Sequence, residues 1–160
     1  MDSSDEEEEI IEDNSFYDKS ENGSAEDRII ITKTTTRAHP IYVIQEHHAS
    51  RLHWDLRFEI DGTLKSWALP KGAPKGNERR LAVQVPDHPV EYAAFEGTIP
   101  EGSYGAGEVK IWDSGTFELE ESRNPDRIVI NIQGNKLKGR YCLLHFKPKE
   151  KKNWLFFKIK

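Results

Sequence analysis

The sequence predicts an all-β fold, either a sandwich or a barrel of short antiparallel strands. Runs rich in β-branched and aromatic residues alternate with turn signals along most of the chain after residue 27. Asp61-Gly62 stands between two such runs, and this dipeptide is a strong signal for a two-residue β-hairpin. No segment shows the 3.6-residue periodicity of an amphipathic helix. These observations together favour an all-β fold over a helical one.

The expected strands follow one another with short connections that are rich in Gly, Pro and Asp. Pro86–Pro89 is expected to end the strand before it, and Asp113–Gly115 to form the turn of a second hairpin. Lys71–Asn77 and Glu96–Gly107 are expected loops, the second of them long and glycine-rich. The expected strands are 28–36, 41–45, 51–60, 64–69, 80–85, 108–112, 116–120, 127–132, 137–146 and 153–160.

Charge is distributed unevenly along the chain. Residues 1–27 carry twelve Asp and Glu against Lys19 alone, a net charge of −11, whereas the remainder carries 16 acidic and 22 basic residues, a net charge of +6. A segment so acidic and so poor in apolar residues cannot bury enough surface to offset its ordering entropy. We therefore predict a disordered acidic tail over 1–27 and one domain over 28–160. A basic domain favours polyanionic partners, nucleic acid first among them.

Cysteine usage and hydropathy narrow the class of protein further. Cys142 is the only cysteine, which excludes a disulfide within the chain and a cysteine-based zinc site. It lies in the apolar run YCLLHF and is expected in the core. No apolar run approaches the ~20 residues that a membrane-spanning helix needs, and no N-terminal apolar segment is present. We expect a soluble, cytoplasmic monomer with no membrane partner.

The expected strand 51–60 carries one apolar face and one ionisable face. Successive side chains of a strand point to opposite sides, so a period of two sorts its residues into two rows. The apolar row should pack on a core, and the ionisable row should face a groove or the lumen of a barrel. The apolar row is Leu52, Trp54, Leu56, Phe58 and Ile60; the ionisable row is Arg51, His53, Asp55, Arg57 and Glu59.

Two histidines and one carboxylate in this region predict a metal site. His53 and Asp55 are two residues apart and leave the strand on the same side, as a shared ion requires. A bend before the strand could bring His47 or His48 over them, and spacing alone does not choose between the two. The competing interpretation is a solvated strand face with chance histidines, because polar outward faces are common on antiparallel sheets.

Further groups are suited to an anionic substrate. Arg57 offers a bidentate fork for phosphate oxygens, and Lys71 offers a point charge. His88 could donate a proton or a hydrogen bond near neutral pH. Arg79 is interpreted as ordinary surface charge, and the glycines of 102–107 as a turn before a strand, since a dinucleotide-binding loop would open a helix.

Two long stretches resemble a known family. QEHHASRLHWDLRFEIDGTLKSWALPKG and RRLAVQVPDHPVEYAAFEGTIPEGSYGAGEVKIWDSG are closely similar to the 3′-phosphoesterase domain attached to bacterial ATP-dependent DNA ligase D, which is also found as a free-standing protein. The resemblance covers Ile41 to Gly115 and continues more loosely to Lys160. It implies a compact β-barrel with a crescent active-site groove. It also implies a manganese-dependent enzyme that heals DNA 3′ ends, and the imidazole and carboxylate donors would also accept Co²⁺, Zn²⁺ or Ni²⁺.

The resemblance also implies roles for individual residues. It selects His47 over His48, so that the metal ligands are His47, His53 and Asp55. Family members that are fused to ligase carry further residues before the first strand that matter for removing a terminal 3′ ribonucleoside, and these do not align here. Removal of a 3′-phosphate is therefore the step that the resemblance carries over. The implied phosphate-binding residues are Arg57, Lys71, Arg80 and His88, and residues implied as important for activity are Gln45 and Tyr92.

The expected partners are primer–template or duplex DNA 3′ ends, and a separate DNA ligase or polymerase. One alternative function is a non-catalytic module that binds DNA ends and recruits repair factors. A second is a small-molecule enzyme that holds iron at the same three ligands. The basic residues near the strand argue against the iron enzyme, because they favour a polyanion.

Overall fold

The computed structural model describes residues 39–120, 124–146 and 151–160. The predicted acidic tail (1–27) and the predicted strand 28–36 lie outside the described residues. Within those described stretches, no helix has the length and apolar character needed to cross a membrane.

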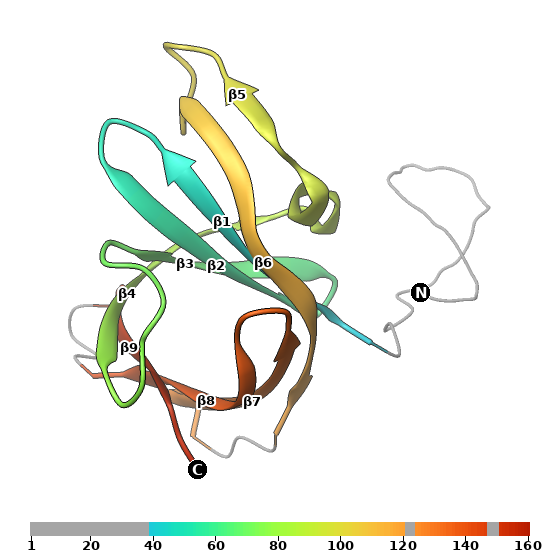
Figure 1. The fold of residues 1–160 in the computed structure, drawn as a ribbon, viewed down its shortest axis with the longest axis vertical. Helices are drawn as coiled ribbons and strands as arrows, with labels where there is room; N and C mark the ends of the chain where they lie inside the picture. The colour runs from blue at the N-terminus through green and yellow to red at the C-terminus, as the bar shows by residue number, and fades with distance from the viewer. Residues whose placement is uncertain (1–38, 121–123, 147–150) are drawn as a thin grey trace. The chain divides into compact units, whose positions relative to one another are not determined.

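Eight antiparallel strands close into a barrel, and a ninth is added at its rim (Figure 1). The ring runs β1-β2-β3-β4-β9-β8-β7-β6 and closes where β6 pairs with β1, while β5 pairs with the outer edge of β6. The predicted barrel is confirmed. The bounds are β1 Ile41–His48, β2 Leu52–Ile60, β3 Thr63–Leu69, β4 Arg79–His88, η2 (a short 3₁₀ helix) Val90–Ala94, β5 Gly97–Ile99, β6 Gly107–Leu119, β7 Arg127–Gly134, β8 Lys138–His145 and β9 Asn153–Lys158.

The core fills the inside of the barrel. Leu56 and Phe58 of β2 are fully buried there, so the residues that alternate with them face outward. The idea that the ionisable row lines the lumen is therefore wrong: it lies on the outer surface, and the apolar row lies inside. A closed barrel of eight strands has an interior just wide enough for side chains to fill, which leaves no room for a polar channel. Buried side chains of this core are Tyr42, Ile44, Leu56, Phe58, Trp67, Leu69, Ala82, Phe117, Ile130, Ile132, Leu137, Tyr141, Leu143, Trp154 and Phe156.

A second, smaller apolar cluster lies on the outside of β1. Val43, Leu64 and Ala93 are buried together, with Ile41, Tyr92 and Ile111 packed against them. Ala93 and Tyr92 belong to η2, so this short helix covers the outer face of β1 and β3. The last part of the ionisable row of β2 thus lies beside a covered patch, since Arg57 pairs with Val43, and this explains how a charged side chain on the outside of a barrel comes to be buried.

The hairpin at Asp61-Gly62 is confirmed. Ile60 pairs with Thr63, and both turn residues have positive φ, 54° at Asp61 and 81° at Gly62. This is the type I′ geometry that matches the twist of the two flanking strands, and Asp-Gly tolerates it at small steric cost.

The predicted second hairpin at Asp113–Gly115 is wrong, because β6 runs without interruption from Gly107 to Leu119. Asp113 is turned inward and accepts hydrogen bonds, so it does not act as a turn residue. Gly115 is required by a close approach of strands, since a Cβ there would overlap the Gln133 carbonyl. The long strand pairs with β1 from Glu108 to Thr116 and with β7 from Gly115 to Leu119, which closes the ring. The predicted loop Glu96–Gly107 also contains a short strand, β5.

The predicted end of a strand at Pro86 is wrong as well, because β4 continues to His88. Ser66 pairs with Val85, but Leu64 pairs with His88, so β4 has one residue more than β3 at this point. Such a bulge accommodates Pro86, which lacks a backbone N–H for the ladder. It also turns His88 to the same side of the sheet as Val85.

Candidate metal centre

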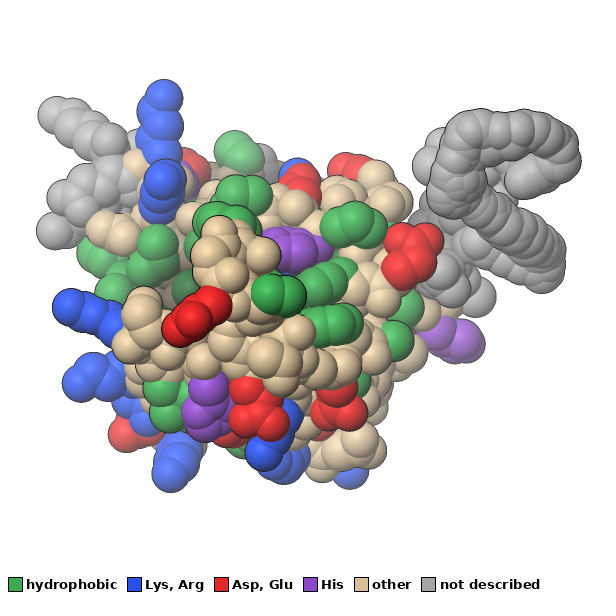
Figure 2. All heavy atoms as spheres, turned by 90° about the horizontal axis from the view of Figure 1, so that it is seen from above, with side chains coloured by type: hydrophobic (Ala, Val, Ile, Leu, Met, Phe, Trp, Pro, Cys, Tyr) green, Lys and Arg blue, Asp and Glu red, His purple; other side chains and the backbone are tan. Residues whose placement is uncertain are grey.

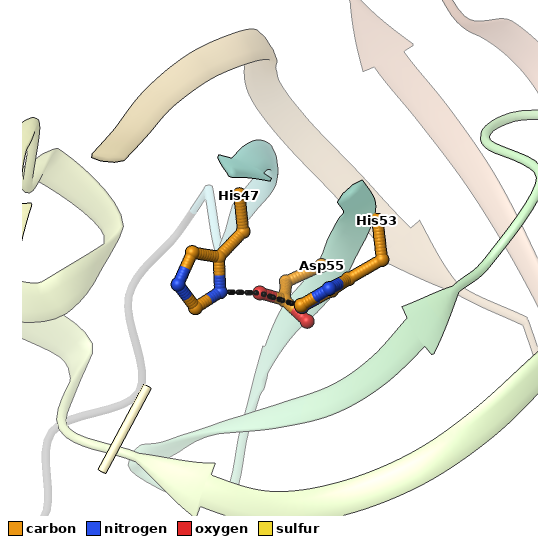
Figure 3. A group of neighbouring side chains, drawn as sticks. All are labelled: His47, His53 and Asp55. Carbon is orange, nitrogen blue, oxygen red and sulfur yellow. Dashed lines mark ion pairs between the residues drawn. The ribbon is translucent and has the colours of Figure 1, made fainter. Parts of the chain in front are cut away.

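His47, His53 and Asp55 converge at one end of the β1–β2 pair (Figure 3). His47 lies directly opposite His53 in the antiparallel register, and Gln45 lies opposite Asp55. Side chains of directly opposed residues project from the same face of the sheet. The two imidazole rings have centroids 4.8 Å apart, and one ligand atom from each of the three residues lies within 4.8 Å of the others. The sequence prediction that these three groups meet is confirmed.

Each imidazole is oriented by a backbone carbonyl. His47 Nε2 is 2.7 Å from the Gly105 carbonyl, and His53 Nδ1 is 3.1 Å from the Arg51 carbonyl. A carbonyl can only accept, so these ring nitrogens carry the protons. The opposite nitrogens, His47 Nδ1 and His53 Nε2, face Asp55 Oδ2 at 3.4 Å and 3.3 Å; a proton on His53 Nε2 is donated to this carboxylate, and in the neutral ring the lone pair there is free for a metal ion. A backbone acceptor behind each ring is the arrangement that fixes metal-ligating histidines in proteins.

Asp55 and the oppositely charged Arg57 are buried side by side. Asp55 is 6% exposed and Arg57 only 3% exposed, and Arg57 Nη2 lies 3.5 Å from Asp55 Oδ2. Burial acts to raise the pKa of Asp55, but the His53 hydrogen bond and the Arg57 charge outweigh it and lower the pKa. The Asp55 hydrogen bond raises the pKa of His53 in return. The carboxylate is therefore ionised at neutral pH and attracts cations.

Arg57 is held rigidly beside the three ligands. Its Nε donates to Gln45 Oε1 at 2.7 Å, and its Nη1 donates to Ser66 Oγ at 2.9 Å. The Gln45 amide in turn donates to the carbonyls of Tyr92 (2.8 Å) and Phe95 (3.2 Å), which ties η2 to β1. The Tyr92 ring lies over the guanidinium at 5.0 Å. Fully buried Gln45 thus positions both Arg57 and η2.

His88 joins this group through the bulge in β4. Its Nδ1 lies 3.1 Å from Arg57 Nη1 and also 3.1 Å from the Pro86 carbonyl. The first contact needs an unprotonated Nδ1 and the second a protonated one, so they correspond to the two tautomers of the ring. Burial and the nearby Arg57 charge lower the pKa of His88, and the ring is neutral at pH 7.

The remaining residues that the sequence singled out are farther from the centre. Exposed His48 turns away and contacts Glu46 Oε2 at 2.6 Å, as expected of the histidine that is not a ligand. Lys71 is exposed in the connection after β3, and Arg80 donates to Ala73 O and Glu78. Among the described residues, neither makes a hydrogen bond or ion pair to the three ligands, and their roles stay predictions. In the view of Figure 2, Lys and Arg side chains lie mainly along the left and lower edges of the molecule rather than across its middle.

Two groups of the centre are missed by sequence reasoning. The pattern predicts only a strand position for Ser66, yet its side chain is fully buried and accepts from Arg57. The pattern predicts only a turn at Gly105, yet its carbonyl orients His47, and its φ of +75° favours glycine. A small polar residue within an apolar strand is the available signal for Ser66. No local pattern marks the Gly105 carbonyl, because its partner is 58 residues away.

Comparison with known proteins finds one family over most of the described barrel. Residues 45–145 match the model of the DNA ligase D 3′-phosphoesterase domain. The multifunctional non-homologous end joining protein LigD of Mycolicibacterium smegmatis is 51% identical over 130 residues, covering 74% of this chain and 17% of the relative. The protein of that name from Pseudomonas aeruginosa is 46% identical over 125 residues, covering 74% and 15%. The chain thus spans about a sixth of the length of these relatives.

Proposed function

Because the chain belongs to the DNA ligase D 3′-phosphoesterase domain family, we propose that it is a metal-dependent phosphoesterase that removes 3′-phosphate from DNA ends. The product would be a 3′-OH, which a DNA ligase or polymerase requires. The observation that carries the proposal is the cluster of two oriented imidazoles and an ionised carboxylate beside a buried arginine. A primer–template or duplex end would be the substrate, and a separate ligase or polymerase would use the product.

The donor set fits a divalent transition metal. His47 Nδ1 and His53 Nε2 face the same carboxylate oxygen, and the other nitrogen of each ring is already satisfied by a backbone carbonyl. Two imidazoles and one carboxylate suit Mn²⁺ and would also accept Co²⁺ or Zn²⁺. We propose Mn²⁺ as the ion, held by these three residues. Bound there, it would supply positive charge to the phosphate oxygens.

The protein groups would bind and orient the phosphate. Hydrogen bonds to Gln45 and Ser66 already hold the Arg57 side chain in place. Binding of a phosphate would therefore cost little further side-chain entropy. We propose that Arg57 binds the phosphoryl oxygens. Lys71 and Arg80 would contact the phosphate from the solvent-exposed side. Tyr92 and Gln45 are positioning residues in this proposal, since both contact the Arg57 side chain.

We propose that His88 is the proton donor to the leaving 3′ oxygen of the sugar. When Nδ1 accepts from Arg57, the proton of the neutral ring is on Nε2, where it can be donated as a hydrogen bond. The negative charge of a bound phosphate would favour the protonated ring and so offset the effect of Arg57. His88 would then deliver a proton to the departing 3′ oxygen. Removal of a terminal 3′ ribonucleoside would use the same phosphate-binding groups on a phosphodiester.

The test is release of phosphate from a 3′-phosphorylated primer–template with Mn²⁺. We expect activity from the wild-type chain and a loss of at least about 10²-fold in Asp55→Ala, since a group that holds transition-state charge is removed. His48→Ala is the matched control, because this neighbouring histidine is exposed and bonds Glu46. It should retain full activity. A wild-type chain that binds the primer yet leaves its end unchanged with every divalent metal would instead indicate a DNA-end-binding module.

A further inference from the structure

We propose that Tyr104 is a stacking platform for the nucleobase next to the scissile phosphate, so that the site selects nucleotides over base-free phosphate esters. The proposal rests on the proposed function and specifies the substrate of that same site. Tyr104 is 82% exposed, more than any other large hydrophobic residue in the described stretches, the next being Leu119 at 50%. An aromatic side chain held in water at such exposure is a typical feature of nucleic-acid-binding surfaces, because every base has a π-face to stack on it.

The loop that carries Tyr104 is anchored to a predicted metal ligand. The next residue, Gly105, accepts the His47 hydrogen bond through its carbonyl, and a Cβ on Gly105 would lie 3.6 Å from the His47 ring. Two turns shape the loop, with Ser103 N donating to Pro100 O and Ala106 N to Ser103 O. In Figure 1 this β5–β6 connection lies at the same end of the barrel as the β1–β2 turn. Tyr104 is therefore displayed at the rim of the centre.

Burial lowers the pKa of Arg57, while Asp55, Tyr92 and Tyr104 act in the opposite direction. A base attached to the sugar beyond the phosphate would extend from the centre across its rim, where the ring of Tyr104 is displayed.

The other aromatic residues near the centre already pack against neighbouring side chains. Tyr92 packs against His88 and Phe95, with ring centroids 4.7 Å and 5.1 Å apart, and Arg57 lies over it as well. Across the described ranges, no ring contact involves Tyr104. Tyr104 is therefore the aromatic residue of this rim whose faces are open to a base.

The experiment compares two primers that differ only at the 3′-terminal nucleotide, one with a normal base and one abasic, each with a 3′-phosphate. On the normal primer, Tyr104→Ala should raise KM about tenfold with kcat within about twofold, and Tyr104→Phe should stay near wild type, because the ring and not the hydroxyl stacks. On the abasic primer, wild type and Tyr104→Ala should have equal KM. Leu119→Ala, at the other end of β6, is the control for removal of an exposed apolar side chain.

Unchanged KM in Tyr104→Ala on the normal primer would overturn the proposal. An equal loss on both primers would overturn it too, because the loop or His47 would then be disturbed. If the wild-type chain releases no phosphate with any divalent metal, the proposed function fails, and stacking is judged by binding instead. A primer ending in 2-aminopurine should then lose fluorescence on the wild-type chain and keep it on Tyr104→Ala; equal quenching by both would reject the stacking role.

Discussion

Asp55 and Asp113 are the two buried aspartates in the described part of the barrel, and they differ in the number and length of their hydrogen bonds. Asp113 is 3% exposed and accepts four short hydrogen bonds, from the Tyr42 hydroxyl at 2.8 Å and from three successive backbone amides, Asn135 to Leu137, at 2.9 Å each. Asp55 is 6% exposed, but its contacts with His47, His53 and Arg57 are all 3.3–3.5 Å long.

The difference separates a carboxylate with a structural role from the one that we propose binds the metal ion. Every lone pair of Asp113 has a donor, so the group holds the β7–β8 connection against β1 and β6 and has no capacity left for a ligand. Asp55 is desolvated without short bonds, and one nitrogen of each neighbouring imidazole faces it at 3.3–3.4 Å. A buried carboxylate that lacks close donors is stable only beside compensating charge. Arg57 supplies part of that charge, and a metal ion would supply the rest.

Asp55→Asn should have the largest effect, and mainly on activity. We expect phosphate release to fall by at least about 10²-fold because the amide is neutral and cannot bind a cation with comparable strength. The free energy of unfolding should fall by only about 1 kcal/mol: the lowered pKa of Asp55 means that its charge stabilises the folded state, but no short hydrogen bond is lost. Initial rates and urea denaturation of the same preparation measure both. A loss of stability of several kcal/mol would mean that Asp55 is structural like Asp113.

Asp113→Asn should show the reverse pattern. One amide group cannot accept from all four donors, so we expect a loss of about 2–4 kcal/mol in the free energy of unfolding by urea. The rate per folded molecule should stay near wild type. Glu120→Gln is the control: Glu120 contacts Arg140 at the exposed surface, and this change should leave stability unaltered. Loss of activity in fully folded Asp113→Asn would contradict the division between the two aspartates.

Metal addition should distinguish the same two sites by thermal denaturation. Mn²⁺ at about 100 times its dissociation constant should stabilise the wild-type chain by roughly 2.7 kcal/mol, because the ion binds the folded state. Asp113→Asn should gain the same increment, and Asp55→Asn should gain none. Equal stabilisation of all three proteins by Mn²⁺ would place the ion elsewhere.

The pH dependence of metal binding should follow His53. The Asp55 hydrogen bond raises the pKa of this imidazole above its ordinary value, so in the metal-free protein a proton occupies His53 to a higher pH than usual. That proton must leave before the ion binds. Below the raised pKa, apparent affinity for Mn²⁺ should rise about tenfold per pH unit, and it should level off above it. Titration calorimetry at several pH values measures this slope, and a flat profile would contradict the role of His53.

The same shift has a consequence for the metal-free fold. The charged form of His53 is favoured in the folded state, so its stabilising contribution is present at acid pH. It is lost as the pH rises through the raised pKa. His88 has the opposite sign, because burial lowers its pKa and its protonation at acid pH disfavours the folded state.

The sequence alone determined the all-β class, most strand positions and the three candidate ligands. Alternation along β2 and the Asp-Gly turn are local signals, since side-chain direction in a strand depends on parity and turn geometry on two residues. For the same reason, parity by itself assigns His53, Asp55 and Arg57 to one face of β2. The family resemblance contributed the choice of His47 over His48.

Tertiary structure decided which face of β2 is outside, and which residues complete the centre. Strand β6 continues without interruption past Asp113 and Gly115, two residues whose local sequence resembles a turn. Its pairing with both β1 and β7 closes the barrel. The partners of Asp113 lie 22–24 residues onward in the chain, apart from Tyr42. The bulge after Val85 turns His88 toward Arg57, and the Gly105 carbonyl orients His47 from 58 residues away. These contacts depend on strand register and ring closure, which no local pattern encodes.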